Sequence, residues 1–352
     1  MNEVERRIHE SEELKRPVAV RPSEVDQTGA VLAGPIRVPE QMHRAVAEFE
    51  GQDTIAVLMR NAEILENAGD YRLALNILRN VLIRKPDDVN ALERMGRCLK
   101  EVGRYDEALK CYRALARTGK RLEAQINVAE IYYLSERDEL ALASYREVLK
   151  NVIEDQDRLF EIYKNVGNIH VRSGDLDAAQ EFYDKAYTIR PDSDVLMVNY
   201  GTLEIQRENL GEAVQRFRRA VELNPENDRG WVGLALVHRQ MGDHELAWAN
   251  GLRALDINKG NRSAARLIVE WAVLDQKYGD AIKTLQDYLE VDGEDAEMSF
   301  TLAKLLTQVG RLNEARVEIE RVLALDPGME GAEALRIALD KELEKRSSWL
   351  KS

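Results

Sequence analysis

An alanine recurs along the chain at a nearly constant interval. The separations between successive members are 34, 33, 38, 34, 34, 34 and 34 residues, and the alanines are Ala74, Ala108, Ala141, Ala179, Ala213, Ala247, Ala281 and Ala315. Two helix backbones approach closely only where a side chain is small, so a small residue at this period is typical of stacked helical hairpins. The spacing therefore predicts an all-α repeat array in which each unit contacts only its neighbours.

Placing the recurring alanine at position 20 divides the chain from residue 55 onward into eight registered units. Position 8 is small in seven units, position 15 is glycine in five, and position 24 is usually large. Position 32 holds every proline beyond residue 50, namely Pro86, Pro191, Pro225 and Pro327. Glycine at position 15 favours a turn after a first helix, and proline at position 32 ends a second one. The units begin at Ile55, Val89, Leu122, Phe160, Asp194, Asp228, Arg262 and Ala296.

At several repeat positions the sequence resembles the tetratricopeptide-repeat family. Trp231 occupies position 4 and Tyr132 occupies position 11, which are two aromatic positions of that family. The fifth unit matches the family at positions 8, 20, 24, 27 and 32, with Gly201, Ala213, Phe217, Ala220 and Pro225. The resemblance covers about residues 55–327 and implies a right-handed α-solenoid of helix-turn-helix repeats. The sequence departs from the pattern at Glu136, Glu208 and Val269, and through four extra residues before the fourth unit.

Three segments follow from this register. Residues 1–50 contain half of the chain's eight prolines and are predicted to form an extended tail, with possible short helices at 2–16 and from Pro39 onward. This tail is either a loose terminus or a linear motif that docks on a partner or on the chain's own array. Residues 51–327 form the predicted eight-repeat array. Residues 328–352 are predicted to provide a capping helix, since the last unit would otherwise expose its core face.

The composition limits the classes of partner. Fifty basic and 63 acidic residues give a net charge of −13, which argues against broad nucleic-acid binding. The chain has no apolar run of about 18 residues, so we expect no membrane insertion. The first residues lack the apolar stretch of a secretory signal, and a cytoplasmic location is expected by default.

No catalytic pattern is visible in the sequence. It lacks a glycine-rich phosphate loop, a nucleophile elbow and a histidine pair at metal spacing, so we expect no enzyme activity, no cofactor and no metal. Cys98 and Cys111 lie among apolar neighbours in one unit and are predicted to be buried, reduced thiols. His170 and His238 occupy position 11, where a core or half-buried role is expected.

In a tetratricopeptide array the first helices line a concave groove, and one position repeats an amide there. Position 6 is Asn127, Asn165 and Asn199 in three successive units. An asparagine offers both a donor and an acceptor, so a ladder of amides suits the backbone of an extended peptide. The sequence therefore predicts that these three residues bind peptide.

A second set of groove residues resembles the carboxylate clamp of chaperone-binding co-chaperones. Lys164, Asn168, Asn199 and Arg229 fill four of its five positions, and Gly233 replaces the arginine of the fifth. Such a set would give charge-assisted hydrogen bonds to one carboxylate. Further groove positions are basic and favour an acidic peptide, among them Arg172, Arg239 and Arg266.

Two functions compete on these residues. The first is a non-catalytic adaptor that binds an extended, acidic or C-terminal peptide segment of another protein. Apolar groove residues such as Val198, Val232 and Leu236 could hold the side chains of that segment. The second is a structural assembly protein that forms a homo-oligomer or joins a large complex through its N-terminal tail and repeat surface. An RNA-reading repeat fits poorly, because the groove positions vary between asparagine, glycine and leucine.

Overall fold

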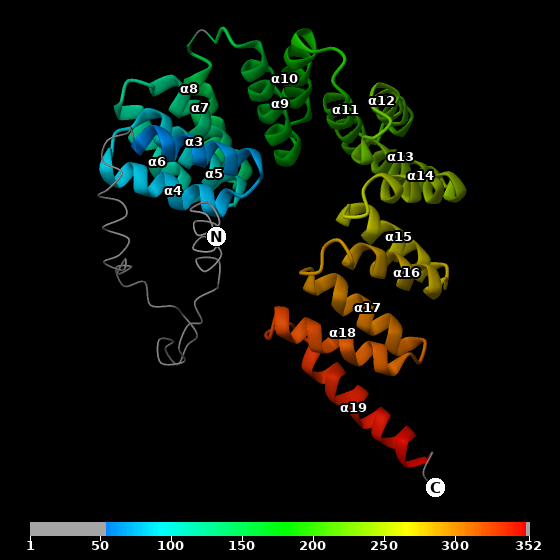
Figure 1. Cartoon of the computed structure of the whole chain (residues 1–352). Coiled ribbons are helices and arrows are strands. Elements are labelled where there is room, and N and C mark those ends of the chain that lie inside the picture. Colours follow the sequence, from blue (N-terminus) through cyan, green and yellow to red (C-terminus); the bar gives the residue numbers. More distant parts are fainter. Residues whose placement is uncertain (1–53, 152, 350–352) are drawn as a thin grey trace, which may run out of the picture. The chain divides into compact units, whose positions relative to one another are not determined.

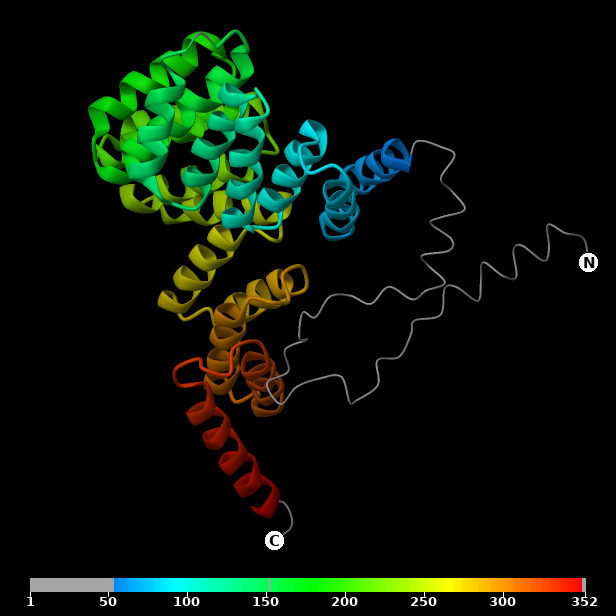
Figure 2. The same cartoon turned by 90° about the vertical axis from the view of Figure 1, so that its left-hand side faces the viewer.

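The structure is a computed structural model that describes residues 54–151 and 153–349. All regular secondary structure in these ranges is helical, and the helices follow one another as hairpins (Figures 1 and 2). The first helices of the hairpins are α3 (Thr54–Asn67), α5 (Val89–Glu101), α7 (Arg121–Leu134), α9 (Gln156–Ser173), α11 (Asp194–Gln206), α13 (Asp228–Met241), α15 (Arg262–Leu274) and α17 (Ala296–Gln308). The second helices are α4 (Tyr71–Arg84), α6 (Tyr105–Arg117), α8 (Asp138–Val148), α10 (Leu176–Ile189), α12 (Leu210–Leu223), α14 (His244–Ile257), α16 (Tyr278–Leu289) and α18 (Leu312–Leu325). The last helix is α19 (Ala332–Trp349).

The recurring alanines lie in the second helix of each hairpin and are fully buried. All eight are 0% exposed, which confirms the predicted all-α repeat solenoid.

The chain divides into two compact units, residues 1–91 and 92–352, with the boundary inside α5. The first unit contains the α3–α4 hairpin, and the second contains the helices from α6 to α19. The predicted tail at 1–50 lies outside the described residues.

Small residues at position 8 make room for large ones at position 24. A Cβ added to Gly167 would lie 2.4 Å from the Tyr183 ring, and one added to Gly201 would lie 2.7 Å from the Phe217 ring. Tyr183 and Phe217 are correspondingly 1% and 2% exposed. Close packing of this kind admits no additional methyl group without displacing the ring. The alternation of small and large residues seen in the sequence is therefore one steric contact repeated along the chain.

Every hairpin turns through a left-handed residue at position 15. In five units this residue is glycine, but Glu136, Glu208 and Gln276 adopt the same conformation, with φ of 55°, 61° and 58°. In all eight units the following N–H donates to the carbonyl five residues earlier, at 2.7–2.9 Å. This is the hydrogen bond of a Schellman motif, which satisfies a free carbonyl at the helix end. The turn therefore persists without its glycine, since the motif and the packing on both sides hold the backbone.

The four extra residues before the fourth unit lengthen a helix. α9 begins at Gln156, four residues before the unit's first position, and has 18 residues where the other first helices have 13 or 14. The Asp155 carboxylate accepts a hydrogen bond from the Arg158 N–H and caps this added turn. Four residues are close to one helical turn, so the rest of α9 keeps its register.

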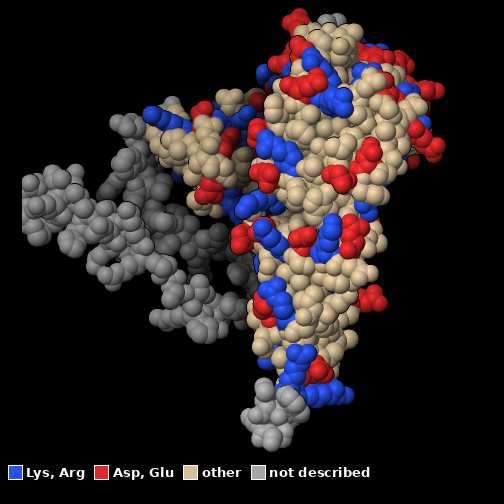
Figure 3. All heavy atoms as spheres, turned by 90° about the vertical axis from the view of Figure 1, so that its right-hand side faces the viewer, with Lys and Arg blue, Asp and Glu red and all other residues tan. Residues whose placement is uncertain are grey.

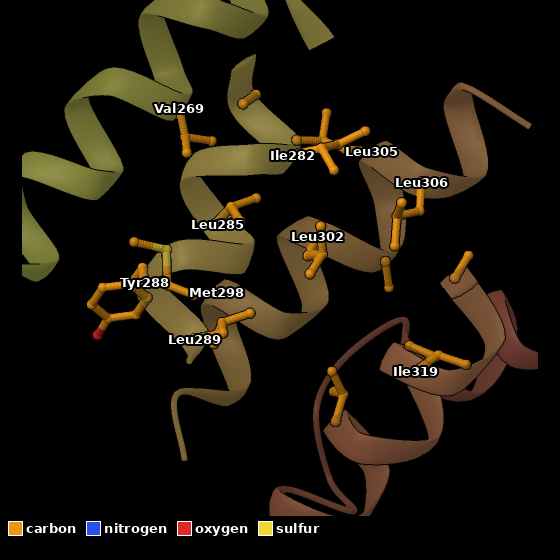
Figure 4. Packing of buried hydrophobic residues seen from close by; sticks show 14 of the residues in the cluster. Val269, Ile282, Leu285, Tyr288, Leu289, Met298, Leu302, Leu305, Leu306 and Ile319 are labelled. Atoms are coloured by element: carbon orange, nitrogen blue, oxygen red, sulfur yellow. The ribbon is translucent and has the colours of Figure 1, made fainter. Parts of the chain in front are cut away.

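At the C-terminal end, α19 packs against α18. Ala332 and Leu339 are buried in a cluster that also includes Ile319 of α18. Figure 4 shows other members of the same cluster, contributed by α15, α16 and α17. The described residues contain no helix that is long and apolar enough to cross a membrane.

Candidate peptide-binding surface

Two members of the predicted asparagine ladder line one pocket between α7 and α9. This pocket, the α7–α9 pocket, has a volume of about 320 Å³. Asn165 lies deep in it, 8% exposed, and its side-chain N–H donates to the Tyr145 hydroxyl at 3.2 Å. The Asn127 amide N–H donates to the Glu123 carbonyl at 2.9 Å. The structure therefore brings Asn127 and Asn165 together, with part of each amide already committed to the protein. The pocket is lined by Ile126, Asn127, Glu130, Tyr145, Asp157, Arg158, Glu161, Ile162, Asn165 and Arg190.

Asn199 differs from the other two. It is half-buried, and its amide nitrogen is enclosed without a hydrogen-bond partner among the residues that the structure describes. It does not line the α7–α9 pocket. The three amides share a sequence position but have three different surroundings, so the structure shows no uniform ladder.

The predicted clamp residues on α9 are engaged in the array itself. Lys164 forms an ion pair with Glu161, and the Lys164 side chain is 16% exposed. Asn168 donates to the Tyr133 hydroxyl at 2.8 Å and accepts from the Tyr183 hydroxyl at 2.7 Å. Asn168 therefore links a first helix to its neighbours on both sides. These hydrogen bonds identify a structural role that the sequence pattern did not reveal.

The fifth clamp position is closed by packing. Gly233 is buried, and a Cβ added to it would lie 2.2 Å from the Phe217 ring of the preceding unit. An arginine side chain at this position would have to displace that ring. Gly233 is therefore a steric requirement of the contact between α12 and α13, and the clamp cannot be completed there.

The additional basic residues of the predicted groove also differ in whether they already have partners within the protein. Arg172 forms an ion pair with Asp138 and lies over the Tyr133 ring, 4.8 Å from its centroid. Arg239 contacts His244 and lies over the Trp271 ring at 5.3 Å. Arg266 is exposed and forms no ion pair with the residues that the structure describes. Over the face seen in Figure 3, basic and acidic side chains are interspersed.

The larger hollow is a groove between α11 and α13, of about 670 Å³, here called the α11–α13 groove. Its wall residues include the predicted Arg229, with Val198, Val232 and Leu236 beside it, and Phe217 and Gly233 also line it. The loop between α14 and α15 contributes Asn258 and Asn261 to the lining. The full lining is Val198, Thr202, Ile205, Gln206, Phe217, Asp228, Arg229, Val232, Gly233, Leu236, Asn258, Gly260, Asn261, Arg262 and Ser263.

Sequence reasoning missed the contribution of this loop. The side-chain amides of Asn258 and Asn261 donate to Asp228 at 2.7 and 2.9 Å. One repeat earlier, Asn224 and Asn227 donate to Asp194 in the same way, at 2.7 and 2.9 Å. The pairs recur at a separation of 34 residues. The signal was therefore present in the sequence, because each asparagine pair lies 30 and 33 residues after an aspartate that starts a first helix, Asp194 of α11 or Asp228 of α13.

The cysteines and position-11 histidines lie within the array. Cys98 and Cys111 are buried and form no disulfide. Burial, with a smaller effect of the nearby Glu107 charge, raises the pKa of the Cys111 thiol to about 11, so the thiol is protonated at neutral pH. The side chains of His170 and His238 are each 12% exposed, beside Asp175 and Asp243.

Comparison with known proteins identifies the family. Models described as tetratricopeptide repeat match residues 66–126 and 272–336, residues 120–192, and residues 201–262. The chain is a tetratricopeptide-repeat protein. The similar solved structures include the APC/C hetero-tetramer Cut9-Hcn1, with a TM-score of 0.50 and 16% identity over 85% of this chain and 59% of that one. At this identity the likeness concerns the fold alone.

Curated relatives of this tetratricopeptide-repeat protein have varied names. Human protein O-mannosyl-transferase TMTC3 is 25% identical over 276 residues, which cover 76% of this chain and 27% of that protein. Tetratricopeptide repeat protein 8 of Caenorhabditis elegans is 28% identical over 45% of this chain and 31% of its own length. Anaphase-promoting complex subunit 3 of Schizosaccharomyces pombe is 27% identical over 38% of this chain and 20% of its own length. The chain thus spans less than a third of each of these relatives.

Proposed function

We propose that this tetratricopeptide-repeat protein is a non-catalytic adaptor that binds an extended segment of a partner protein along its first helices. The observation that carries this proposal is the α11–α13 groove, which is open and has both an apolar wall and polar groups at its rim. Repeat arrays use such surfaces to bind extended peptides, because neighbouring first helices present parallel rows of side chains. Apolar contacts supply binding energy, and polar groups orient the bound chain.

The groove combines buried apolar residues with exposed polar residues, as peptide recognition requires. Val232 is 8% exposed, whereas Thr202 and Gln206 are exposed on α11. A bound segment could cover the apolar wall and form hydrogen bonds with the exposed polar side chains beside it. The mannosyl-transferase name of one relative does not carry over, since the likeness covers 27% of that protein.

Filling the groove with a bulky side chain tests the proposal. Thr202→Trp places an indole in the groove, and Thr188→Trp places one on α10, outside the groove lining. Both threonines are exposed, and both hydroxyls donate to a backbone carbonyl of their own helix. In affinity purification with mass spectrometry, Thr202→Trp should lose partners that wild type and Thr188→Trp retain. Identical partner lists for all three proteins would overturn the proposal.

One observation favours the assembly function as a second candidate. Val57 and Ile64 of α3 are 52% and 57% exposed. They occupy positions 3 and 10, and the hydrophobic residues at these positions in the other units are at most 5% exposed, for example Leu196 at 0% and Leu305 at 5%. Each of these side chains is already about half buried, so burying the rest against a second copy of the chain would contribute about 1 kcal/mol of favourable free energy per side chain.

The assembly function predicts that the protein in solution has a higher mass than a single chain. If two copies associate through this face, the wild-type protein should have a higher mass by light scattering than the Val57→Ser/Ile64→Ser variant. Val317→Ser serves as a control, because Val317 is 64% exposed on α18, which belongs to the other compact unit. A wild-type protein that stays monomeric as its concentration rises would eliminate this candidate.

A further inference from the structure

Resting on the proposed function, we infer that the α11–α13 groove binds an internal acidic residue flanked by an aliphatic residue, and that it does not bind a free C-terminal carboxylate. The inference concerns the chemistry of the bound segment. It depends on three features of the groove, namely the state of its charges, the composition of its wall and the engagement of the other clamp residues.

Only one of the charged side chains that line the groove is free of partners within the described chain. Asp228 accepts two amide hydrogen bonds, from Asn258 and Asn261. Arg262 forms ion pairs with Asp295 and Glu297. The guanidinium of Arg229 is exposed and makes no hydrogen bond or ion pair with a residue that the structure describes. A guanidinium presents paired N–H donors that match the two oxygens of a carboxylate.

An aliphatic wall lies beside this guanidinium. Arg229 and Val232 are three residues apart on α13, which places them on neighbouring parts of one helix face. Val198 lies across the groove on α11, and Leu236 extends the wall by one further helical turn. Both side chains are half-buried and could lose their remaining exposure to a ligand. An acidic residue on Arg229 therefore brings its neighbours in the bound chain against aliphatic carbon.

The remaining clamp positions do not converge on this site. Lys164 and Asn168 of α9 are held by Glu161 and by Tyr133 and Tyr183, and neither lines the groove. Gly233 has no room for a side chain under Phe217. A terminal carboxylate would thus meet the guanidinium of Arg229 and no second cation free of ion pairs, because Arg262, which also lines the groove, pairs with Asp295 and Glu297. An internal carboxylate meets the same guanidinium, and in addition the chain on both sides of it can contact the wall.

Two peptide libraries distinguish the possibilities. Random peptides are displayed on phage either within a loop, with no free end, or with a free C-terminal carboxylate, and both libraries are selected on the full-length protein. We expect enrichment from the loop library, with Asp or Glu close to Val, Ile or Leu. Amidating the C-terminus of a selected synthetic peptide should leave its Kd unchanged. Replacing its acidic residue by the corresponding amide should weaken binding about tenfold, the loss of one charge-assisted hydrogen-bonded pair.

Variants of the protein complete the test. Arg229→Ala should weaken binding of the selected peptide about tenfold, whereas Lys164→Ala should not change it. Arg218→Ala is the matched control, because Arg218 is an exposed arginine of α12 that does not line the groove. Enrichment from the free-carboxylate library alone, or abolition of binding by amidation, would overturn the inference and leave the proposed function standing. Enrichment from neither library would overturn both.

Discussion

At the scale of single residues, identity follows from the space and backbone conformation that each repeat position allows. Position 15 requires a left-handed backbone in every unit, and three units meet this requirement without glycine. Position 8 requires a small side chain, since an aromatic ring packs over it in several units. Two predictions test these requirements separately.

Glu208→Gly should stabilise the protein. Glu208 has a φ of 61°, and a side chain in this region costs about 1–2 kcal/mol relative to glycine. Glycine adds entropy to the unfolded chain, so we expect a net gain of about 0.5–1 kcal/mol in the free energy of unfolding, measured by urea denaturation. The same substitution at Glu181, an exposed residue in the middle of α10, should cost about 1 kcal/mol. Equal effects at both sites would show that the left-handed turn carries no strain.

Gly167→Ala should destabilise the protein. Its Cβ would lie 2.4 Å from the Tyr183 ring, whose hydroxyl is held by Asn168. We expect a loss of about 1–3 kcal/mol in the free energy of unfolding, the usual cost of overpacking. Gly211→Ala in α12 is the control, because no heavy atom lies within 4 Å of its added Cβ, and it should be neutral or stabilising. A stable Gly167→Ala protein would mean that the ring moves freely.

At the scale of elements, two of the loops between repeats are held by hydrogen bonds to half-buried carboxylates, those of Asp194 and Asp228. The Asp194 carboxylate, at the start of α11, accepts hydrogen bonds from Asn224 and Asn227 across one repeat. Burial opposes its ionisation, but these amide donors and backbone N–H groups outweigh burial and lower its pKa below 3.8. The ionised form therefore fixes the loop that precedes α13.

This shift gives a pH dependence with a definite sign. Because the pKa of Asp194 is lower in the folded state, its contribution to stability is complete above the unfolded value of 3.8 and is lost as the pH falls through the folded value. The thermal midpoint of wild type should therefore fall below about pH 4 more steeply than that of Asp194→Asn, measured by circular dichroism. Parallel curves for the two proteins would show that this carboxylate does not link folding to pH.

At the scale of the whole molecule, a repeat array needs a covered end. Leu339 of α19 is 1% exposed and belongs to the cluster that continues into α18, α17 and α16. Leu339→Ala should lower the free energy of unfolding by about 2–4 kcal/mol, through lost burial and a cavity. Ile337→Ala, on the same helix but 56% exposed, should change it by less than about 0.5 kcal/mol. If both variants unfold at the same urea concentration, α19 does not stabilise the array.

The sequence by itself determined the repeat. The position of each helix, the burial of the recurring alanines and the family all follow from a period of 34 residues, since this period repeats one local packing problem. Contacts within one hairpin are local, so residues such as Gly167 and Tyr183 could be assigned from spacing alone.

The tertiary structure decided which groove residues are free to bind. Lys164, Asn168 and Arg229 look equivalent in a sequence pattern, but the first two are engaged by Glu161 and by tyrosines of neighbouring helices. Arg229, by contrast, has no hydrogen-bond or ion-pair partner in the part of the chain that the structure describes. The closure of the fifth clamp position likewise depends on Phe217, 16 residues before Gly233 in the chain. A side chain's availability depends on partners from other helices, and the spacing within one repeat does not specify those partners.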